Sequence, residues 1–245
     1  MSKILNYLWR GWMIILGTVL TLVLGIPVLL LSIRKEHYPY AYKVIRIWCY
    51  GMFYGMGFRY ELIRLTEKKI DPKTQYVFIS NHTSIMDVML PCILMPRHPL
   101  CYVGKKELVK IPIFGTIYKR VCVMVDRKSA KSRAEVYIRC TERMEEGQSI
   151  VIFPEGGVPD DTSVILDNFK DGAFILASKH HSPLAVFTFV GLKEMFPFEN
   201  SKGHPGKVKV YFNEILSPDK SANDLKAEAH QLIKNVLKTR NEKIN

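Results

Sequence analysis

An apolar run near the amino terminus constrains the fold of this chain more than any other feature. Residues 11–33 contain no charged side chain, and the segment WMIILGTVLTLVLGIPVLLLSI is apolar nearly throughout. A helix of this length is long enough to cross the hydrocarbon core of a bilayer. It is too long for the apolar part of a signal peptide and lacks a small-x-small cleavage site before Arg34, so we expect it in the mature protein.

A second stretch, residues 38–58, alternates Tyr, Trp, Phe and Met with basic side chains, as is typical of a bilayer interface. We therefore expect residues 1–58 to be membrane helices, either a spanning helix followed by a surface helix or a hairpin within one leaflet. The alternative for the second stretch is a core helix of the domain that follows. More Lys and Arg follow the apolar run than precede it. The positive-inside rule thus favours a cell (inner) membrane protein whose main domain faces the cytoplasm.

Residues 59–245 are predicted to form one α/β domain. Short β-rich runs alternate there with helical patterns, and several runs are continuously apolar, as expected of strands covered on both faces. The alternation predicts a mixed, largely parallel sheet of about seven strands flanked by helices. A last helix is expected after Ser221. The expected strands are residues 59–63, 76–80, 100–103, 121–125, 149–153, 184–190 and 207–212.

The formal net charge of +12 predicts attraction to an anionic partner, such as lipid headgroups or phosphate-bearing substrates. Nucleic acid is a poorer candidate, because the aromatic residues concentrate beside the apolar amino terminus and not among the basic residues of the domain. The five cysteines never form a CxxC pair, so we expect buried thiols and neither disulfides nor a metal site. The sequence also has no P-loop, no GxGxxG and no GxSxG motif of a lipase.

The segment NHTSIMD follows the expected strand 76–80 and carries a histidine, His82, five residues before an aspartate, Asp87. The carboxylate can accept a hydrogen bond from one ring nitrogen and leave the other nitrogen as a general base. These are the base and the orienting acid of a triad without its hydroxyl, which indicates that the substrate supplies the hydroxyl. Thr83 and Ser84 fit helix capping better than the role of nucleophile.

Two further polar segments follow expected strands, and the carboxyl ends of strands are where such sheets place their chemistry. The segment FPEGG carries Glu155 and Gly156, and backbone N–H groups near Gly156 are a candidate oxyanion site. The segment VMVDRK carries Arg127 and Lys128, which are suited to clamp a phosphate.

In this order and spacing the segments resemble the glycerolipid acyltransferase family, and specifically its 1-acylglycerol-3-phosphate acyltransferases, over roughly residues 75–190. NHTSIMD is similar to the family's first block, in which the residues matching His82 and Asp87 are catalytic. Residues 104–127 are similar to the second block, whose basic acceptor-binding residue matches Arg127.

FPEGG is similar to the family's third block, which implies that Glu155 and Gly156 take part in binding the acceptor. The segment that begins with Pro183 and Leu184 resembles the apolar fourth block, which implies that these two residues help to line the acyl site.

The resemblance implies transfer of a fatty acyl group from a thioester to the sn-2 hydroxyl of lysophosphatidic acid, giving phosphatidic acid for phospholipid synthesis. The thioester is carried by acyl carrier protein or coenzyme A as a co-substrate, and the resemblance implies no metal and no other cofactor. It implies anionic membrane lipid, the lysophospholipid and acyl carrier protein as partners.

One departure from the family pattern concerns the acceptor. Members that act on lysophosphatidic acid commonly continue the third block as FPEGTR, whereas GVPDD, residues 157–161, occupies the corresponding place here. Lys105, Lys106, Arg127 and Lys170 are the candidates to compensate for the absent arginine. Two alternatives stay open: an acceptor that is another lysolipid or an N-acylated amino-acid lipid, and a catalytically silent membrane tether.

Overall fold

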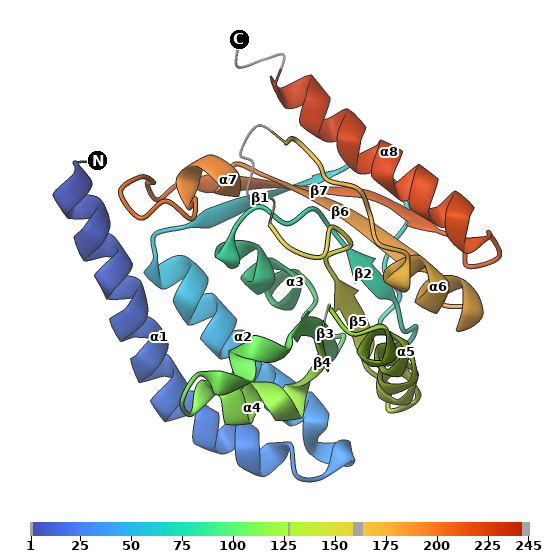
Figure 1. Ribbon diagram of the computed structural model, residues 1–245, viewed down its shortest axis with the longest axis horizontal. Coiled ribbons are helices and arrows are strands. Elements are labelled where there is room, and N and C mark those ends of the chain that lie inside the picture. Colours follow the sequence, from blue (N-terminus) through green and yellow to red (C-terminus); the bar gives the residue numbers. More distant parts are fainter. Residues whose placement is uncertain (1, 127, 159–163, 242–245) are drawn as a thin grey trace.

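The computed structural model describes residues 2–126, 128–158 and 164–241 and contains one seven-stranded sheet between helical layers (Figure 1). All seven expected strands are confirmed, with ends that differ from the prediction by at most four residues. The strands are β1 (Arg59–Arg64), β2 (Val77–Ile79), β3 (Leu100–Lys105), β4 (Cys122–Val125), β5 (Ser149–Ile152), β6 (Leu184–Val190) and β7 (Lys207–Leu216).

Helices account for most of the remaining described chain, and the helix expected after Ser221 is confirmed. The α-helices are α1 (Lys3–Leu31), α2 (Tyr38–Gly55), α3 (Met89–Leu94), α4 (Phe114–Val121), α5 (Ala130–Glu145), α6 (Gly172–Lys179), α7 (Leu192–Met195) and α8 (Ala222–Asn241). The 3-10 turns are η1 (Lys35–His37), η2 (Ile85–Val88) and η3 (Lys106–Lys110).

The sheet is mixed and largely parallel, as expected. Its strand order is β1-β7-β6-β2-β5-β3-β4, and β6 with β7 is the antiparallel pair. Strands β2 to β6 all point the same way, so their carboxyl ends share one edge of the sheet. Because β2 and β5 are neighbours in register, the segments that follow them begin side by side at this carboxyl edge.

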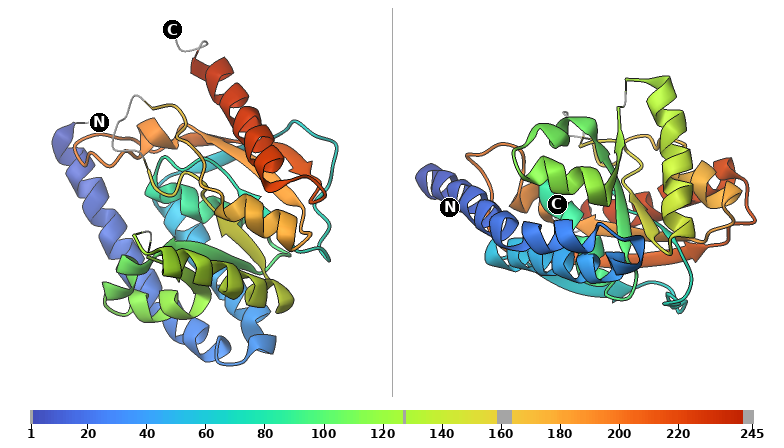
Figure 2. Two further views of the ribbon diagram at one scale, coloured as in Figure 1. Left: turned by 45° about the vertical axis from the view of Figure 1, so that its right-hand side comes forward. Right: turned by 90° about the horizontal axis from the view of Figure 1, so that it is seen from below.

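Alternate residues of the central strands face two hydrophobic cores. On β2, Phe78 packs in the core shared with α2 and α3, whereas Val77 and Ile79 pack in the core shared with α6 and α8. Successive side chains of a strand point to opposite faces. The layers of Figures 1 and 2 therefore explain why these strands are apolar without interruption.

Helices α1 and α2 form an antiparallel hairpin on one side of the domain (Figure 2). Small residues let the two helices approach, since a Cβ added to Gly51 or Gly55 would meet leucine side chains of α1 at 2.8 and 2.7 Å. Helix α2 is also a core helix, because Tyr42 and Phe53 are fully buried beneath the sheet. The expected division at residue 58 therefore marks a change of secondary structure and not a gap in packing.

Among the described residues, α1 is the one helix that is long and apolar enough to cross a membrane, by length and composition. Only 11% of its most apolar window is buried against the domain. The large apolar side chains of its outer face, including Ile14, Ile15, Val23 and Ile26, are exposed. Such a continuous apolar surface on a domain indicates a site of contact with another apolar phase.

Candidate active site

His82 and Asp87 lie together at the carboxyl edge of the sheet. The Nδ1 atom of His82 is 3.2 Å from Oδ2 of Asp87, whose side chain is fully buried, whereas the histidine ring is 17% exposed. With the Nδ1 proton donated to Asp87, Nε2 carries the lone pair. Nε2 has no hydrogen-bond partner among the described residues. The pair therefore has the geometry of an oriented general base.

Local backbone structure fixes the aspartate. Ser84 is the N-cap of η2, and Asp87 completes a capping box with it, as the capping role expected for Ser84 requires. Oδ2 of Asp87 accepts from the N–H groups of Thr83 at 2.5 Å and Ser84 at 2.7 Å, in addition to His82. A buried carboxylate is costly unless hydrogen bonds replace its water. These donors replace water at Oδ2 and hold the carboxylate of Asp87 beside His82.

The segment after β5 contacts the histidine from the other side. The ring of Phe153 stacks on the ring of His82, with centroids 4.3 Å apart. Glu155 is 5% exposed, and its Oε1 accepts from the backbone N–H of His82 at 2.7 Å while Oε2 accepts from the N–H of Asp167 at 3.0 Å. Burial raises the pKa of Glu155 to about 7, against the opposing effect of these two hydrogen bonds.

Gly156 follows with a left-handed φ of 77°, which allows the chain to turn at the end of FPEGG. Its N–H donates to the carbonyl of Phe153 at 3.0 Å. This N–H is therefore already occupied within the turn, and the structure does not leave it to an oxyanion. Glu155 likewise has both oxygens bonded to backbone N–H groups, so the two residues shape the loop beside His82. Their contact with the acceptor stays a prediction.

A cavity of about 360 Å³ opens beside His82. Its walls are overwhelmingly apolar and come from α1, α2, α3, β3 and α4, which converge on this side of the sheet. The exposed lining residues Ile85, Lys105, Leu108 and Phe198 mark its mouth. A space of this size and character suits an extended hydrocarbon chain.

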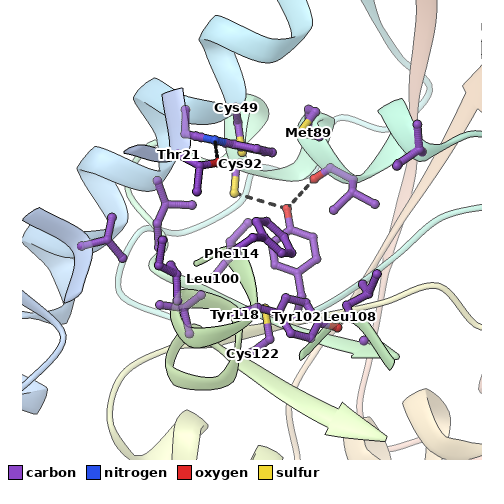
Figure 3. A pocket seen from close by; sticks show the side chains of 18 of the residues that line it. Thr21, Cys49, Met89, Cys92, Leu100, Tyr102, Leu108, Phe114, Tyr118 and Cys122 are labelled. Carbon is purple, nitrogen blue, oxygen red and sulfur yellow. Dashed lines mark hydrogen bonds between the residues drawn. The ribbon is translucent and has the colours of Figure 1, made fainter. Parts of the chain in front are cut away.

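Several polar groups that line the cavity are hydrogen-bonded to other groups of its wall. The hydroxyl of Tyr102 lies between the carbonyl of Val88, at 3.0 Å, and Sγ of Cys92, at 3.3 Å (Figure 3). Trp48 donates its indole N–H to Thr21 at 3.1 Å where α2 faces α1. These polar atoms are therefore already hydrogen-bonded, and the interior offers an acyl chain a largely apolar wall.

The sequence-predicted basic residues fall in different places. Lys105 ends β3 and lines the mouth of the cavity, whereas the exposed Lys106 begins η3 and is not a lining residue. Arg127 lies outside the described residues. Lys128 is exposed at the turn that follows.

The structure does not bring Pro183 and Leu184 to this cavity, which corrects their expected role in lining the acyl site. They lie where β6 begins, at the edge of the sheet opposite His82, and the Pro183 carbonyl accepts from the N–H of Val77. Leu184 is fully buried in the core shared with α6 and α8. The resemblance located an apolar segment, but the direction of its strand places that segment away from the histidine.

Sequence reasoning missed most of the cavity wall. The contribution of α1, through Leu24, Gly25 and Val28, and that of α4, through Ile117, had no motif to indicate it. Phe153 is the first residue of FPEGG, and an aromatic residue directly before the Glu155 turn was the available signal for its contact with His82. Among the described residues, no group of three His, Cys, Asp or Glu side chains is placed to hold a metal ion.

Comparison with protein families agrees with this geometry. A family model described as Acyltransferase matches residues 63–190, which include the segments around both His82 and Glu155. Among curated proteins, a 1-acyl-sn-glycerol-3-phosphate acyltransferase of Chlamydomonas reinhardtii is 27% identical over 168 residues, covering 68% of this chain and 49% of that protein. This chain thus spans about half the length of that relative.

Bacterial relatives show similar matches. A 1-acyl-sn-glycerol-3-phosphate acyltransferase of Helicobacter pylori is 26% identical, covering 60% of this chain and 61% of the relative. A probable enzyme of the same name from Mycoplasma genitalium is 28% identical, covering 72% and 67%. The crystal structure of the 1-acyl-sn-glycerophosphate acyltransferase PlsC from Thermotoga maritima superposes with a TM-score of 0.78 over 98% of both chains at 22% identity, which shows a shared fold.

Proposed function

This chain belongs to the acyltransferase family, and from that membership we propose that it transfers a fatty acyl group from a thioester to the sn-2 hydroxyl of lysophosphatidic acid, giving phosphatidic acid. The observation that carries the proposal is the position of His82, oriented by a buried carboxylate at the mouth of an apolar cavity. Relatives named 1-acyl-sn-glycerol-3-phosphate acyltransferase support this choice of acceptor.

The chemistry follows from the free nitrogen of His82. Nε2 removes the proton of the acceptor hydroxyl as its oxygen attacks the thioester carbonyl, and Asp87 stabilises the resulting imidazolium through Nδ1. The tetrahedral intermediate then expels the thiolate, which takes the proton back from Nε2. An ester and a free thiol result, and the histidine returns to its starting state without a covalent acyl-enzyme.

The acyl chain of the donor occupies the apolar cavity in this proposal. Its carbonyl then lies near His82 and Lys105, and the hydrocarbon extends toward the wall formed by α1 and α4. Burial of each CH₂ group stabilises the complex by about 0.8 kcal/mol. The cationic side chain of Lys105 is suited to attract the acceptor phosphate or the anionic carrier of the thioester.

We further propose that α1 lies in the plane of the bilayer interface and does not span the membrane. Along its length α1 contacts the domain: Trp9 donates to Met56, Trp12 donates to Gly55, and Gly25 faces Ile117 of α4. A spanning α1 would draw α2 and α4 into the hydrocarbon with it. In the interface, its exposed apolar face enters one leaflet and the cavity mouth stays near lipid substrates.

A purified-enzyme assay tests the activity. The full chain is given a labelled acyl group on coenzyme A or on acyl carrier protein, together with lysophosphatidic acid, other lysophospholipids or an N-acylated amino acid. Acylation of lysophosphatidic acid is the expected result, and the two donor arms identify the carrier. Acylation of the N-acylated amino acid alone would transfer the proposal to that acceptor. Acylation of none would leave a catalytically silent membrane tether.

A further inference from the structure

The loop between α7 and β7 contacts the segment that carries His82. Ser84 donates its hydroxyl to the carbonyl of Phe196 at 2.8 Å, in a fully buried contact between residues 112 positions apart. The N–H of Ser84 donates to Asp87 at the same time. The Phe196 carbonyl therefore helps to fix Ser84, which caps η2 and donates its N–H to Asp87.

The other side of this loop is held by α1. The guanidinium of Arg10 lies 3.6 Å from the centre of the Phe196 ring, and its Nη2 donates to the carbonyls of Pro197 at 2.6 Å and Lys202 at 3.2 Å. Asn6, one turn earlier on α1, donates to Ser201 at 2.9 Å.

Arg10 is 8% exposed, although it lies on a largely apolar helix. A buried charge is costly unless hydrogen bonds and a polarisable surface replace its water. The carbonyls of Pro197 and Lys202 and the ring of Phe196 provide these contacts. The arrangement is thus a specific link between α1 and the loop, and a lipid-facing helix has no need of such a residue for its contact with lipid.

We propose that Arg10 is a positioning residue for the His82–Asp87 pair. By holding Phe196, it fixes the partner of Ser84 and, through Ser84, the carboxylate that orients the histidine. The inference deepens the proposed function and rests on it for the activity measurement. Because α1 is also the helix with the exposed apolar face, the seating of this helix in lipid is linked to the geometry of the base.

The test uses the full chain in lipid nanodiscs and compares Arg10→Ala, Arg10→Lys and Trp12→Phe. Trp12 is the matched control: it is on the same helix and donates to Gly55 at 3.0 Å, and among the described residues it has no hydrogen bond or ring stacking with the loop between α7 and β7. We expect kcat for Arg10→Ala to fall on the order of 10²-fold, as displacement of a catalytic group by about 1 Å can cause, with little change in KM for the acyl donor. Arg10→Lys retains the charge and recovers part of kcat, and Trp12→Phe leaves kcat unchanged.

Hydrogen exchange gives a readout that does not depend on activity. The amides of Thr83 and Ser84 donate to Asp87, so we expect them to exchange faster in Arg10→Ala while the amides of β2 stay as protected as in the unsubstituted chain. The same amides are expected to be unaffected in Trp12→Phe.

Unchanged exchange at Thr83 and Ser84 together with unchanged kcat would overturn the inference. Faster exchange throughout β2 would overturn it as well, because that result describes general destabilisation. If Arg10→Ala does not fold, Arg10→Lys decides by the same two measurements. An unsubstituted chain that transfers no acyl group overturns the proposed function, and the exchange comparison still tests Arg10.

Discussion

The backbone N–H of His82 donates a hydrogen bond to the buried carboxylate of Glu155 at a distance of 2.7 Å. The segments that follow β2 and β5 are thus joined at the residue with the free ring nitrogen. The second oxygen of Glu155 holds Asp167. Glu155 therefore contacts His82 through the backbone. Its protonation state is expected to change the free energy of unfolding, because its carboxyl group joins the two loops.

The first prediction concerns pH. Burial raises the pKa of Glu155 from 4.5 to about 7, so the folded chain binds this proton more tightly than the unfolded chain does. The contribution of Glu155 to the free energy of unfolding is therefore fully present below pH 4.5 and decreases as pH rises through about 7. The shift corresponds to roughly 3 kcal/mol. Denaturant unfolding at several pH values between 4 and 8 measures it.

The control for this prediction is Glu155→Gln, which cannot ionise. The difference in unfolding free energy between the unsubstituted chain and this variant isolates the one carboxyl group, because all other titrations cancel. A difference that does not vary with pH would show that Glu155 has the same pKa in both states.

The second prediction concerns the base. His82→Ala is expected to lower kcat by about 10²–10⁴-fold, the usual contribution of a general base, while binding to lipid vesicles is retained because α1 is untouched. The measurements are acyl transfer and vesicle flotation. His180→Ala is a matched control: its ring contacts Ser182 at the end of α6 and lies outside the cavity. Substantial activity in His82→Ala would remove the histidine from the mechanism.

The third prediction concerns the length of the acyl chain. Gly25 lines the cavity, and a Cβ placed there would lie 2.6 Å from Cδ1 of Ile117. Gly25→Leu is therefore expected to narrow the space between α1 and α4 and to shift the preferred donor toward shorter chains. Competition between donors of different chain length measures the shift.

Gly11→Leu serves as the control for the cavity, because a Cβ at Gly11 meets nothing within 4 Å. Both substitutions add the same side chain to the same helix. Equal donor preferences in the two variants would place the acyl chain elsewhere.

The fourth prediction concerns the orientation of α1 in the membrane. Lys3 and Arg34 flank the helix and are both exposed. If α1 lies in one leaflet, Lys3→Cys and Arg34→Cys are both labelled by an impermeant maleimide added to the same side of sealed vesicles. The unsubstituted chain, with four of its five cysteines buried, gives the background. Labelling of only one of the two positions from that side would establish a spanning helix.

The strands were predictable because each one has a local sequence pattern. Each is an apolar run followed by turn residues. Because the central strands are buried on both faces, their apolar residues are not interrupted by polar ones. The extension of β7 to Leu216 was not predictable, since it depends on pairing with β6 as far as Leu184. Strand order has the same origin, because partners distant in sequence decide it.

The site was predictable in part for a related reason. His82 and Asp87 are only five residues apart, so their spacing in the sequence was enough to predict that they are in contact. Glu155 was found, but not its backbone partners, because contacts between separate loops leave no local pattern. The expected strand 184–190 itself argued against Leu184 as a lining residue, since a residue that begins a strand parallel to β2 lies at the edge away from His82.

The wall that α1 gives to the cavity has a practical consequence for anyone who prepares this protein. Apolar amino-terminal segments are commonly cut away to obtain a water-soluble catalytic unit. Here the cut would open one flank of the space beside His82, through the loss of Leu24, Gly25 and Val28. It would also release the contacts of Arg10 with the loop behind Ser84. The helix with the exposed apolar face also forms part of the cavity wall, so a shortened chain would lose both together.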